Sequence, residues 1–279
     1  MRQRLQILLV LSFFVFSKIT GQTFEVGGFA GVSNYMGDLQ QSDFEYETTH
    51  EAYGFFVRYN VNKQLGLKAH LYKGKISGND AHYPELKNVR ERNLSFRSNL
   101  YELGLQAEVT LVSFGERKKM AAPFIYTGLN VFYFNPQANY QGRWVDLQPL
   151  GTEGQGQAGN PDKYNRLQIS IPIGIGFFVR IAERMNLGFE VGFRKTFTDY
   201  IDDVSGNYPN IAALEESSPM TAALSFRSPE IVSTAGSNPQ GRQRGSAASK
   251  DMYFFGGVTF SYVLFERLGK RKKRYKYNR

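Results

Sequence analysis

The sequence contains no cysteine, one tryptophan and three histidines. Without cysteine the chain has no disulfide framework, no thiolate zinc ligand, no thiol nucleophile and no lipid-anchored N-terminal cysteine. The histidines do not occur in the His-Glu-x-x-His spacing of zinc hydrolases, and no Gly-x-Ser-x-Gly nucleophile elbow is present. We therefore expect a protein that is not an enzyme and that needs no cofactor or metal.

The sequence also lacks a long apolar stretch. Residues 1–22 are predicted to form a signal peptide, because Arg2 and Arg4 precede an apolar run from Ile7 to Phe16. That run is too short to cross a bilayer of roughly 30 Å as a helix, although a retained single-helix anchor is the alternative. No later segment approaches the ~20 apolar residues of a membrane helix. Any membrane span must then be made of strands.

Net charge is unevenly distributed along the chain. The formal charge is +9, but residues 266–279 hold eight Lys or Arg and one Glu, a net of +7. Arg2, Arg4 and Lys18 supply a further +3 within the predicted signal peptide, which leaves −1 for the rest. The basic character belongs to a C-terminal tail, so the composition does not indicate a nucleic-acid partner.

What the sequence has in abundance is alternation of apolar and polar residues with a period of two. Residues 53–61 and 65–72, joined by a tight turn, each present an apolar face and a largely polar face. The same pattern recurs in six further segments: 24–33, 101–111, 125–133, 167–180, 187–194 and 254–264. Pro172 falls inside one of them and predicts a bulge or a local break in pairing.

The connections between these segments alternate in length. Short connections at 62–63, 114–122 and 182–185 alternate with long ones near 36–51, 75–92, 136–163 and 198–250. Short periplasmic turns and long outer loops are typical of outer-membrane barrels. The predicted fold class is therefore all-β, an antiparallel transmembrane β-barrel of about eight strands. It spans residues 23–265, between the signal peptide (1–22) and a basic periplasmic tail (266–279).

A soluble barrel or sandwich is the alternative, because alternation does not say which face points inward. The membrane interpretation is favoured by charges of both signs on the polar faces, which we expect to pair in the lumen: Glu25, Arg58, Lys68, Glu102, Glu108, Arg180, Glu190 and Arg194. Aromatic residues near strand ends are predicted to form interfacial girdles: Tyr59, Tyr133, Phe134, Phe197 and Tyr262. A barrel of this size is filled by side chains, which argues against a pore.

Three groups of residues are candidates for chemical sites. His50 and His82 are expected in outer loops and His70 on a polar strand face, where each is either a base or ligand, or a loop or lumen residue. Asp199, Asp202 and Asp203 either bind a hard cation such as calcium or cap a turn at a strand end. The glycine-rich residues 151–157 lack the Lys-Ser or Lys-Thr of a phosphate loop and predict a flexible outer loop.

The basic clusters are the predicted partner-binding residues. An even number of strands places both chain ends on the short-turn side, together with the 114–122 turn. The tail cluster is either a solvated tail or a docking element for an acidic periplasmic partner or lipid head groups. The predicted contacts are Arg117, Lys118, Lys119, Lys270, Arg271, Lys272, Lys273 and Arg274.

Several phrases are more specific than general barrel patterning. They include SNYMGDL (33–39), NLSFRS (93–98), FNPQA (134–138), WVDLQPLGTEGQG (144–156), PIGIGF (172–177) and RKTFTDYIDDVS (194–205). Together they resemble the PorG family, outer-membrane barrel components of the type IX secretion system, over residues 24–265. The resemblance implies a non-enzymatic part of that machinery, which exports proteins and in some species supports gliding.

The resemblance also implies partners, namely a periplasmic ring of a lipoprotein and its companion, of the PorK and PorN types, and outer-membrane lipid. Two other hypotheses remain open. One is an outer-membrane binding protein, adhesin-like, that uses its long loops, especially 198–250. The other is a barrel enzyme with a nucleophile near His70 or His82.

Overall fold

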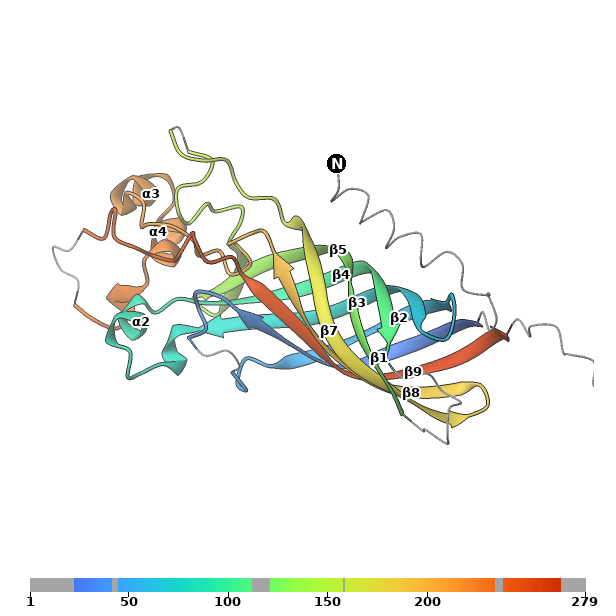
Figure 1. Cartoon of the computed structure of the whole chain (residues 1–279). Coiled ribbons are helices and arrows are strands. Elements are labelled where there is room, and N and C mark those ends of the chain that lie inside the picture. Colours follow the sequence, from blue (N-terminus) through green and yellow to red (C-terminus); the bar gives the residue numbers. More distant parts are fainter. Residues whose placement is uncertain (1–22, 42–44, 112–120, 158, 234–237, 267–279) are drawn as a thin grey trace, which may run out of the picture.

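The computed structural model describes residues 23–41, 45–111, 121–157, 159–233 and 238–266. Eight long strands dominate it (Figure 1). They are β1 (Thr23–Met36), β2 (His50–Asn60), β3 (Leu65–Asn79), β4 (Ser95–Thr110), β5 (Ala121–Tyr140), β7 (Leu167–Ala182), β8 (Met185–Thr196) and β9 (Met252–Glu266). Every segment predicted from the alternation coincides with one of these strands, although Val61 and Leu111 lie one residue beyond the ends of β2 and β4.

The strands close into a barrel in which every pair is antiparallel. Sequential neighbours pair from β1 to β5, β5 pairs with β7, and β7, β8 and β9 continue the sheet. Pairing of β1 with β9, from Thr23 opposite Glu266 to Met36 opposite Met252, closes the cylinder. A short strand, β6 (Arg143–Asp146), forms a hairpin with the last residues of β5, from Gln137 to Tyr140. The predicted eight-stranded antiparallel barrel is confirmed.

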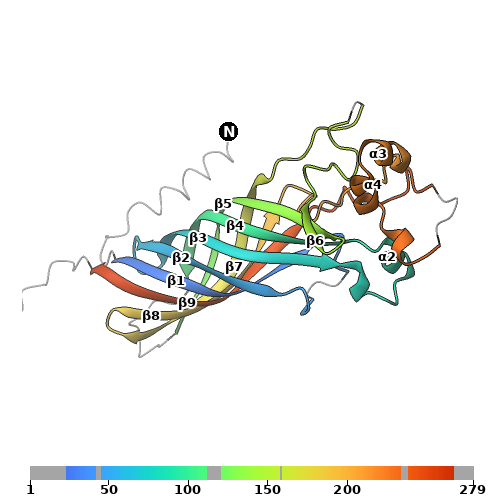
Figure 2. The same ribbon diagram turned by 180° about the vertical axis from the view of Figure 1, so that it is seen from behind.

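The two ends of the barrel differ sharply (Figures 1 and 2). One end carries the 61–64 and 183–184 turns together with the first residue of β1 and the last of β9. The other carries the long connections, which contain η1 (Asp80–His82), α2 (Lys87–Arg92), α3 (Ile211–Ser217), α4 (Pro219–Ser225) and η2 (Ser228–Glu230). We call this second end the loop cap. No helix within the described ranges is long and apolar enough to cross a membrane.

The strands are longer at the cap end than the sequence pattern predicts. Pairing of β3 with β4 continues to Asn79 opposite Ser95, and β5 runs on to Tyr140. Polar residues occupy the outward face of these extensions, while apolar residues such as Ile76 and Leu100 face inward. The apolar face of the pattern therefore changes sides, although the backbone ladder continues. Three of the four long connections are therefore shorter than predicted, while the last, residues 197–251, is two residues longer.

The outward face of the barrel is apolar and exposed. Phe55, Leu103 and Leu105 are 75%, 63% and 68% exposed, and Ile173 and Ile175 are each 60% exposed. A continuous apolar surface of this kind is unfavourable in water and suits the hydrocarbon region of a bilayer. The barrel therefore has the inside-out pattern of a transmembrane β-barrel, and the soluble alternative is not supported.

Pro172 interrupts one ladder without shifting it. Between β5 and β7, pairing runs to Thr127 opposite Ile173 and resumes at Asn130 opposite Ser170 in the same register. Proline has no N–H to donate, which accounts for the missing pairs. On its other side Pro172 lies opposite Arg194 of β8 in an unbroken register. Of the two alternatives, the local break is correct and there is no bulge.

Two residue placements differ from the sequence prediction. Phe134 was expected in an aromatic girdle, but it is fully buried because it faces the lumen, one residue away from the outward-facing Tyr133. Arg180 was expected inside the lumen, but it is exposed at the short-turn rim, where β7 ends. Tyr59 and Phe197 are exposed on the barrel exterior, as predicted.

Candidate functional site

The lumen is filled by two networks of buried charge. In the first, Arg58 Nη1 lies 3.2 Å from Glu25 Oε2 and Arg58 Nε lies 2.7 Å from Glu108 Oε2. Lys68 Nζ lies 3.3 Å from Glu108 and 2.7 Å from Glu190. These side chains are at most 7% exposed. Buried ions are tolerated only when each has its counter-charge, so the network fixes these side chains in place.

The second network is centred on Glu102. Its carboxylate lies 3.2 Å from Arg194 Nη2 and 2.8 Å from His70 Nε2, and it accepts a hydrogen bond of 2.7 Å from the Tyr253 hydroxyl. Toward the cap, aromatic and aliphatic side chains including Phe132 and Phe255 continue the filling as an apolar core. Salt-bridged lumen filling is therefore confirmed for seven of the eight predicted residues, and the eighth, Arg180, differs in being exposed at the rim.

The histidines fall into two settings. His70 is buried beside Glu102 and Tyr72, with ring centroids 4.3 Å apart in the latter pair. His50 begins β2, slightly inside the strand rather than in the loop, and its Nε2 lies 2.7 Å from Ser77 Oγ. His82 lies in the cap, in η1, 3.3 Å from Glu47. Each ring is engaged in local hydrogen bonding or pairing.

The loop cap brings together three of the distinctive sequence phrases. From residues 144–156, Thr152 donates to the Asp203 carboxylate, and Glu153 accepts from the backbone of Ser205 at 2.9 Å. From residues 33–39, the Tyr35 hydroxyl donates to Asp202. Segments far apart in the sequence are thus joined through buried polar contacts. The glycine-rich 151–157 segment is a loop, but a packed one, with Thr152 fully buried.

Two of the three aspartates of this region, Asp202 and Asp203, act as structural acceptors, and Asp199 is buried beside them. Asp202 accepts from the Val204 amide at 2.9 Å, and Asp203 accepts from the Tyr164 hydroxyl at 2.6 Å. Burial raises the pKa of Asp203 and of Asp199 to about 6, and raises the pKa of Asp202 well above its usual range. Within the described residues, no group of three or more His, Cys, Asp or Glu side chains is arranged to hold a metal ion. The hydrogen bonds of Asp202 and Asp203 support the turn-capping alternative for these two residues.

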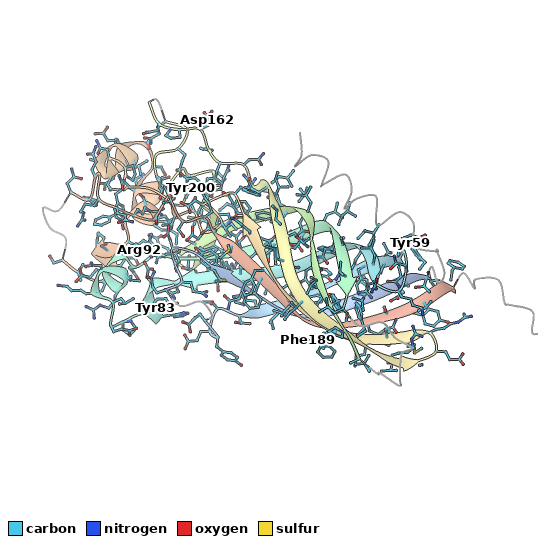
Figure 3. All side chains as sticks on the ribbon, in the orientation of Figure 1. Tyr59, Tyr83, Arg92, Asp162, Phe189 and Tyr200 are labelled. Atoms are coloured by element: carbon cyan, nitrogen blue, oxygen red, sulfur yellow. The ribbon has the colours of Figure 1, made fainter. Side chains whose placement is uncertain are left out.

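Two arginines clamp the cap together. Arg92 of α2 donates to the Asp80 carboxylate at 2.7 and 2.8 Å and to the carbonyls of Asp38 and Arg244. Arg244 in turn pairs with Glu153 at 2.9 Å. Figure 3 shows Arg92 in the cap, Tyr59 near the opposite end and Phe189 on the barrel exterior. Neither arginine clamp can be predicted from the sequence, because Arg92 and Arg244 are far along the chain from several of their partners and no local spacing identifies them.

Next to these clamps lies a polar cleft of about 620 Å³ between α2 and the β8–β9 connection. It is lined by residues that include Asp38, Asn88, Arg92, Tyr208, Phe226, Arg242 and Arg244. At the opposite end, a pocket of about 210 Å³ opens at the short-turn rim. Its lining includes Glu25, Arg58, Asn60, Lys63, Arg180 and Asn186.

The predicted partner-binding cations all lie outside the described residues: Arg117, Lys118, Lys119, Lys270, Arg271, Lys272, Lys273 and Arg274. The predicted signal peptide does so as well. The partner-binding role of these cations and the signal peptide stay predictions. The described part of the same rim does carry exposed cations, namely Lys63, Arg180 and Arg184.

The sequence model of one protein family matches residues 3–217, and that family is described as a domain of unknown function, DUF6089. The chain belongs to this family. The match includes all but one of the barrel strands and the three phrases that meet in the cap. A comparison with curated protein sequences gave no match.

Solved structures of several surface proteins are weakly similar. Neisserial surface protein A (NspA) is 8% identical with a TM-score of 0.42, over 87% of this chain and 97% of its own. Ail of Yersinia pestis, in complex with the heparin analogue sucrose octasulfate, is 6% identical with a TM-score of 0.41, over 88% and 99%. The outer membrane protein OprG from Pseudomonas aeruginosa is 9% identical with a TM-score of 0.39, over 88% and 98%. The barrel described above rests on its own strand pairing.

Proposed function

We propose that the protein is an integral barrel of the bacterial outer membrane and a non-enzymatic component of the type IX secretion machinery. In this role it anchors a periplasmic ring of the PorK and PorN types. The observation that carries the proposal is the filled lumen, with its two buried ion-pair networks and aromatic core. A barrel without a conduit works through its two ends and its outer wall. The resemblance to the PorG family supports the choice of machinery.

The outer membrane is the location that the surface chemistry supports. An apolar exterior around a polar, ion-paired interior is stable only where hydrocarbon surrounds the barrel. The predicted signal peptide supports export. In barrels of this class short turns face the periplasm and long loops face outward, so the loop cap is extracellular.

Charge supports the periplasmic end as the anchoring surface. The last described residue of β9, Glu266, lies at the short-turn end, so the basic residues that follow it in the sequence start from there. The exposed rim cations Lys63, Arg180 and Arg184 lie at that same end. A cationic rim and tail favour an acidic surface on the partner through long-range attraction and short ion pairs.

The test is a pull-down of the tagged full-length chain from outer membranes in mild detergent, with the co-purifying proteins quantified by mass spectrometry. Reversing the tail cations to glutamate at 270–274 is expected to lower recovery of the ring lipoprotein by about tenfold, equivalent to roughly 1.4 kcal/mol of lost attraction. The matched control reverses two cap cations, Arg242→Glu with Lys250→Glu, and is expected to leave recovery unchanged. Both variants must still migrate as heat-modifiable barrels.

Two results would contradict the proposal in separable ways. Full recovery of the ring by the tail variant removes the tail from the interface. Absence of every type IX component from the wild-type pull-down removes the assignment to that machinery.

A second candidate is an outer-membrane binding protein that acts through its loop cap. The folded cap and its polar cleft of about 620 Å³ favour it. In that case the Arg242→Glu and Lys250→Glu control becomes the sensitive variant. It loses capture of the external ligand, while the tail variant retains it.

A further inference from the structure

The outer wall of the barrel changes character abruptly on β3, β4 and β5, on the cap side of the apolar belt. Within the belt, Leu71 lies opposite Leu103, which lies opposite Val131. The next outward-facing row pairs Lys73 with Tyr101 and Tyr101 with Tyr133. The two rows beyond are polar, and they contain Lys75 opposite Asn99 and Ser77 opposite Arg97. Apolar, aromatic and cationic layers thus follow one another along the strands.

The aromatic row has cations set among its rings. Lys73 Nζ lies 5.6 Å from the ring centre of Tyr53 and 5.7 Å from that of Tyr101. Arg166 Cζ lies 5.5 Å from the ring centre of Tyr133. Tyrosines with basic residues at this depth are the pattern of a membrane–water interface, where an aliphatic stem lies along the rings and the charge reaches the headgroups.

Beyond this row, the wall is hollowed into a groove of about 240 Å³ lined by Lys75, Arg97, Ser98, Asn99 and Gln137. Trp144 of β6 lies beside it, with Arg97 Cζ 3.6 Å from the indole ring centre. Arg97 Nε reaches Gln137 Oε1 at 3.4 Å, a long contact. Stacking on Trp144 fixes the plane of the Arg97 guanidinium. The terminal N–H groups of Arg97 are then available to bind a ligand in the groove.

The cations of this wall lack counter-ions of their own. Among the described residues, no carboxylate lies within 4.0 Å of the Lys73, Lys75 or Arg97 charge. Two acids lie on the same side of the sheet. Glu51 is exposed on the wall at the start of β2, and Asp146 of β6 accepts from Gln137 Nε2 at 2.7 Å. Together with Arg166, the wall carries four cations and two acids, so it has an excess of positive charge.

We propose that this wall, the cationic face of Lys73, Lys75, Arg97 and Arg166, binds the phosphorylated headgroup of a lipid in the outer leaflet. Lys75 and Arg97 bind a phosphate in the groove, and Lys73 and Arg166 bind at the tyrosine row. The acyl chains lie against the apolar belt directly below. A phosphate is the anion that fits, because it accepts several charge-assisted hydrogen bonds at once from lysine and arginine. The inference rests on the outer-membrane location proposed above and assigns the outer wall a ligand.

The test uses the purified full-length protein in detergent, titrated with diphosphorylated lipid A and followed by native mass spectrometry. The Lys75→Gln, Arg97→Gln double variant is expected to bind lipid A about tenfold more weakly than wild type, the effect of losing roughly 1.4 kcal/mol. The matched control is Lys195→Gln, since Lys195 also faces outward but lies on β8, separated from this wall by β7. It is expected to stay within about twofold of wild type. Heat-modifiable migration confirms that each variant is folded.

Two further arms identify the source of the phosphate. Dephosphorylated lipid A is expected to bind wild type as weakly as lipid A binds the double variant. Inorganic phosphate at millimolar concentration is expected to leave bound lipid A in place, and its displacement of the lipid would overturn the assignment in favour of a free anion. Equal lipid affinity of the double variant and wild type would overturn it as well. Because this assay contains only protein and lipid, its result is independent of whether the ring co-purifies.

Discussion

The Glu102 network offers a sharp test of how the lumen is held together. We predict that Glu102→Gln destabilises the folded barrel by about 3–5 kcal/mol, the cost of leaving a buried charge without its partner. Arg194 is fully buried, and its remaining described hydrogen bond is from Nη1 to the Gly192 carbonyl. Glutamine keeps the shape of the side chain, so the variant removes the charge and leaves the packing.

A double-mutant cycle separates the charge effect from packing. Glu102→Gln combined with Arg194→Met removes both charges and is expected to recover most of the loss, because no unpaired ion then remains in the lumen. The control is Glu230→Gln, which breaks an ion pair of 2.9 Å to Arg227 at the cap surface, where the Glu230 side chain is 50% exposed. That change is expected to cost less than about 1 kcal/mol.

The assay is equilibrium unfolding in urea of the barrel refolded into phospholipid vesicles, read by the shift in gel mobility between folded and unfolded chain. A loss below about 1 kcal/mol for Glu102→Gln would refute the reasoning, since it would mean that water already solvates Arg194. A double variant as unstable as the sum of the single variants would refute it too, because the two residues would then act independently.

Two further predictions concern the loop cap. Asp203 and Asp199 have pKa values of about 6 in the folded protein, against 3.8 in the unfolded chain. Between these values the folded cap binds more protons than the unfolded chain does. Its stability therefore falls as the pH rises from about 4 to 6. The protection factors of the cap amides, which correct for the intrinsic pH dependence of exchange, should therefore be higher at pH 4 than at pH 7, and equal protection factors at both pH values would count against it. Arg92→Gln should expose residues 198–250 to protease cleavage about tenfold faster while the barrel stays heat-modifiable, because the buried pair with Asp80 is lost. Lys87→Gln, which loses only an exposed pair of 3.9 Å, should match wild type.

The strand segments, their order and the closed barrel were accessible from the sequence because alternation is a local property. Leu103 and Leu105 face one way and Glu102 and Gly104 the other whatever the chain does elsewhere. The alternation of short and long connections likewise placed the cap at one end. Where the outward face turns polar, as along β3 beyond Lys73, the apolar face changes sides and the predicted strands ended too early.

Which of the lumen charges pair with one another could be known only from the closed barrel. Lys68 and Glu190 are far apart in the sequence and meet only because β3 and β8 face each other across the lumen. Phe134 shows that the position of a residue along the chain does not determine whether its side chain faces the lumen or the exterior. The sequence places it just past the end of the predicted strand 125–133, but β5 runs on to Tyr140, and the position of Phe134 in the pleat directs its side chain inward.

The sequence by itself determined the strands and gave each of them one apolar and one largely polar face, since the two faces of a strand alternate residue by residue. The closed structure decided that the apolar face points outward. Only the tertiary structure decided which of the lumen charges pair, that three remote phrases meet in the cap, and that cations and tyrosines of β3, β4 and β5 share one wall. These are contacts across strands and loops, and their partners are set by register and closure, which no local pattern encodes.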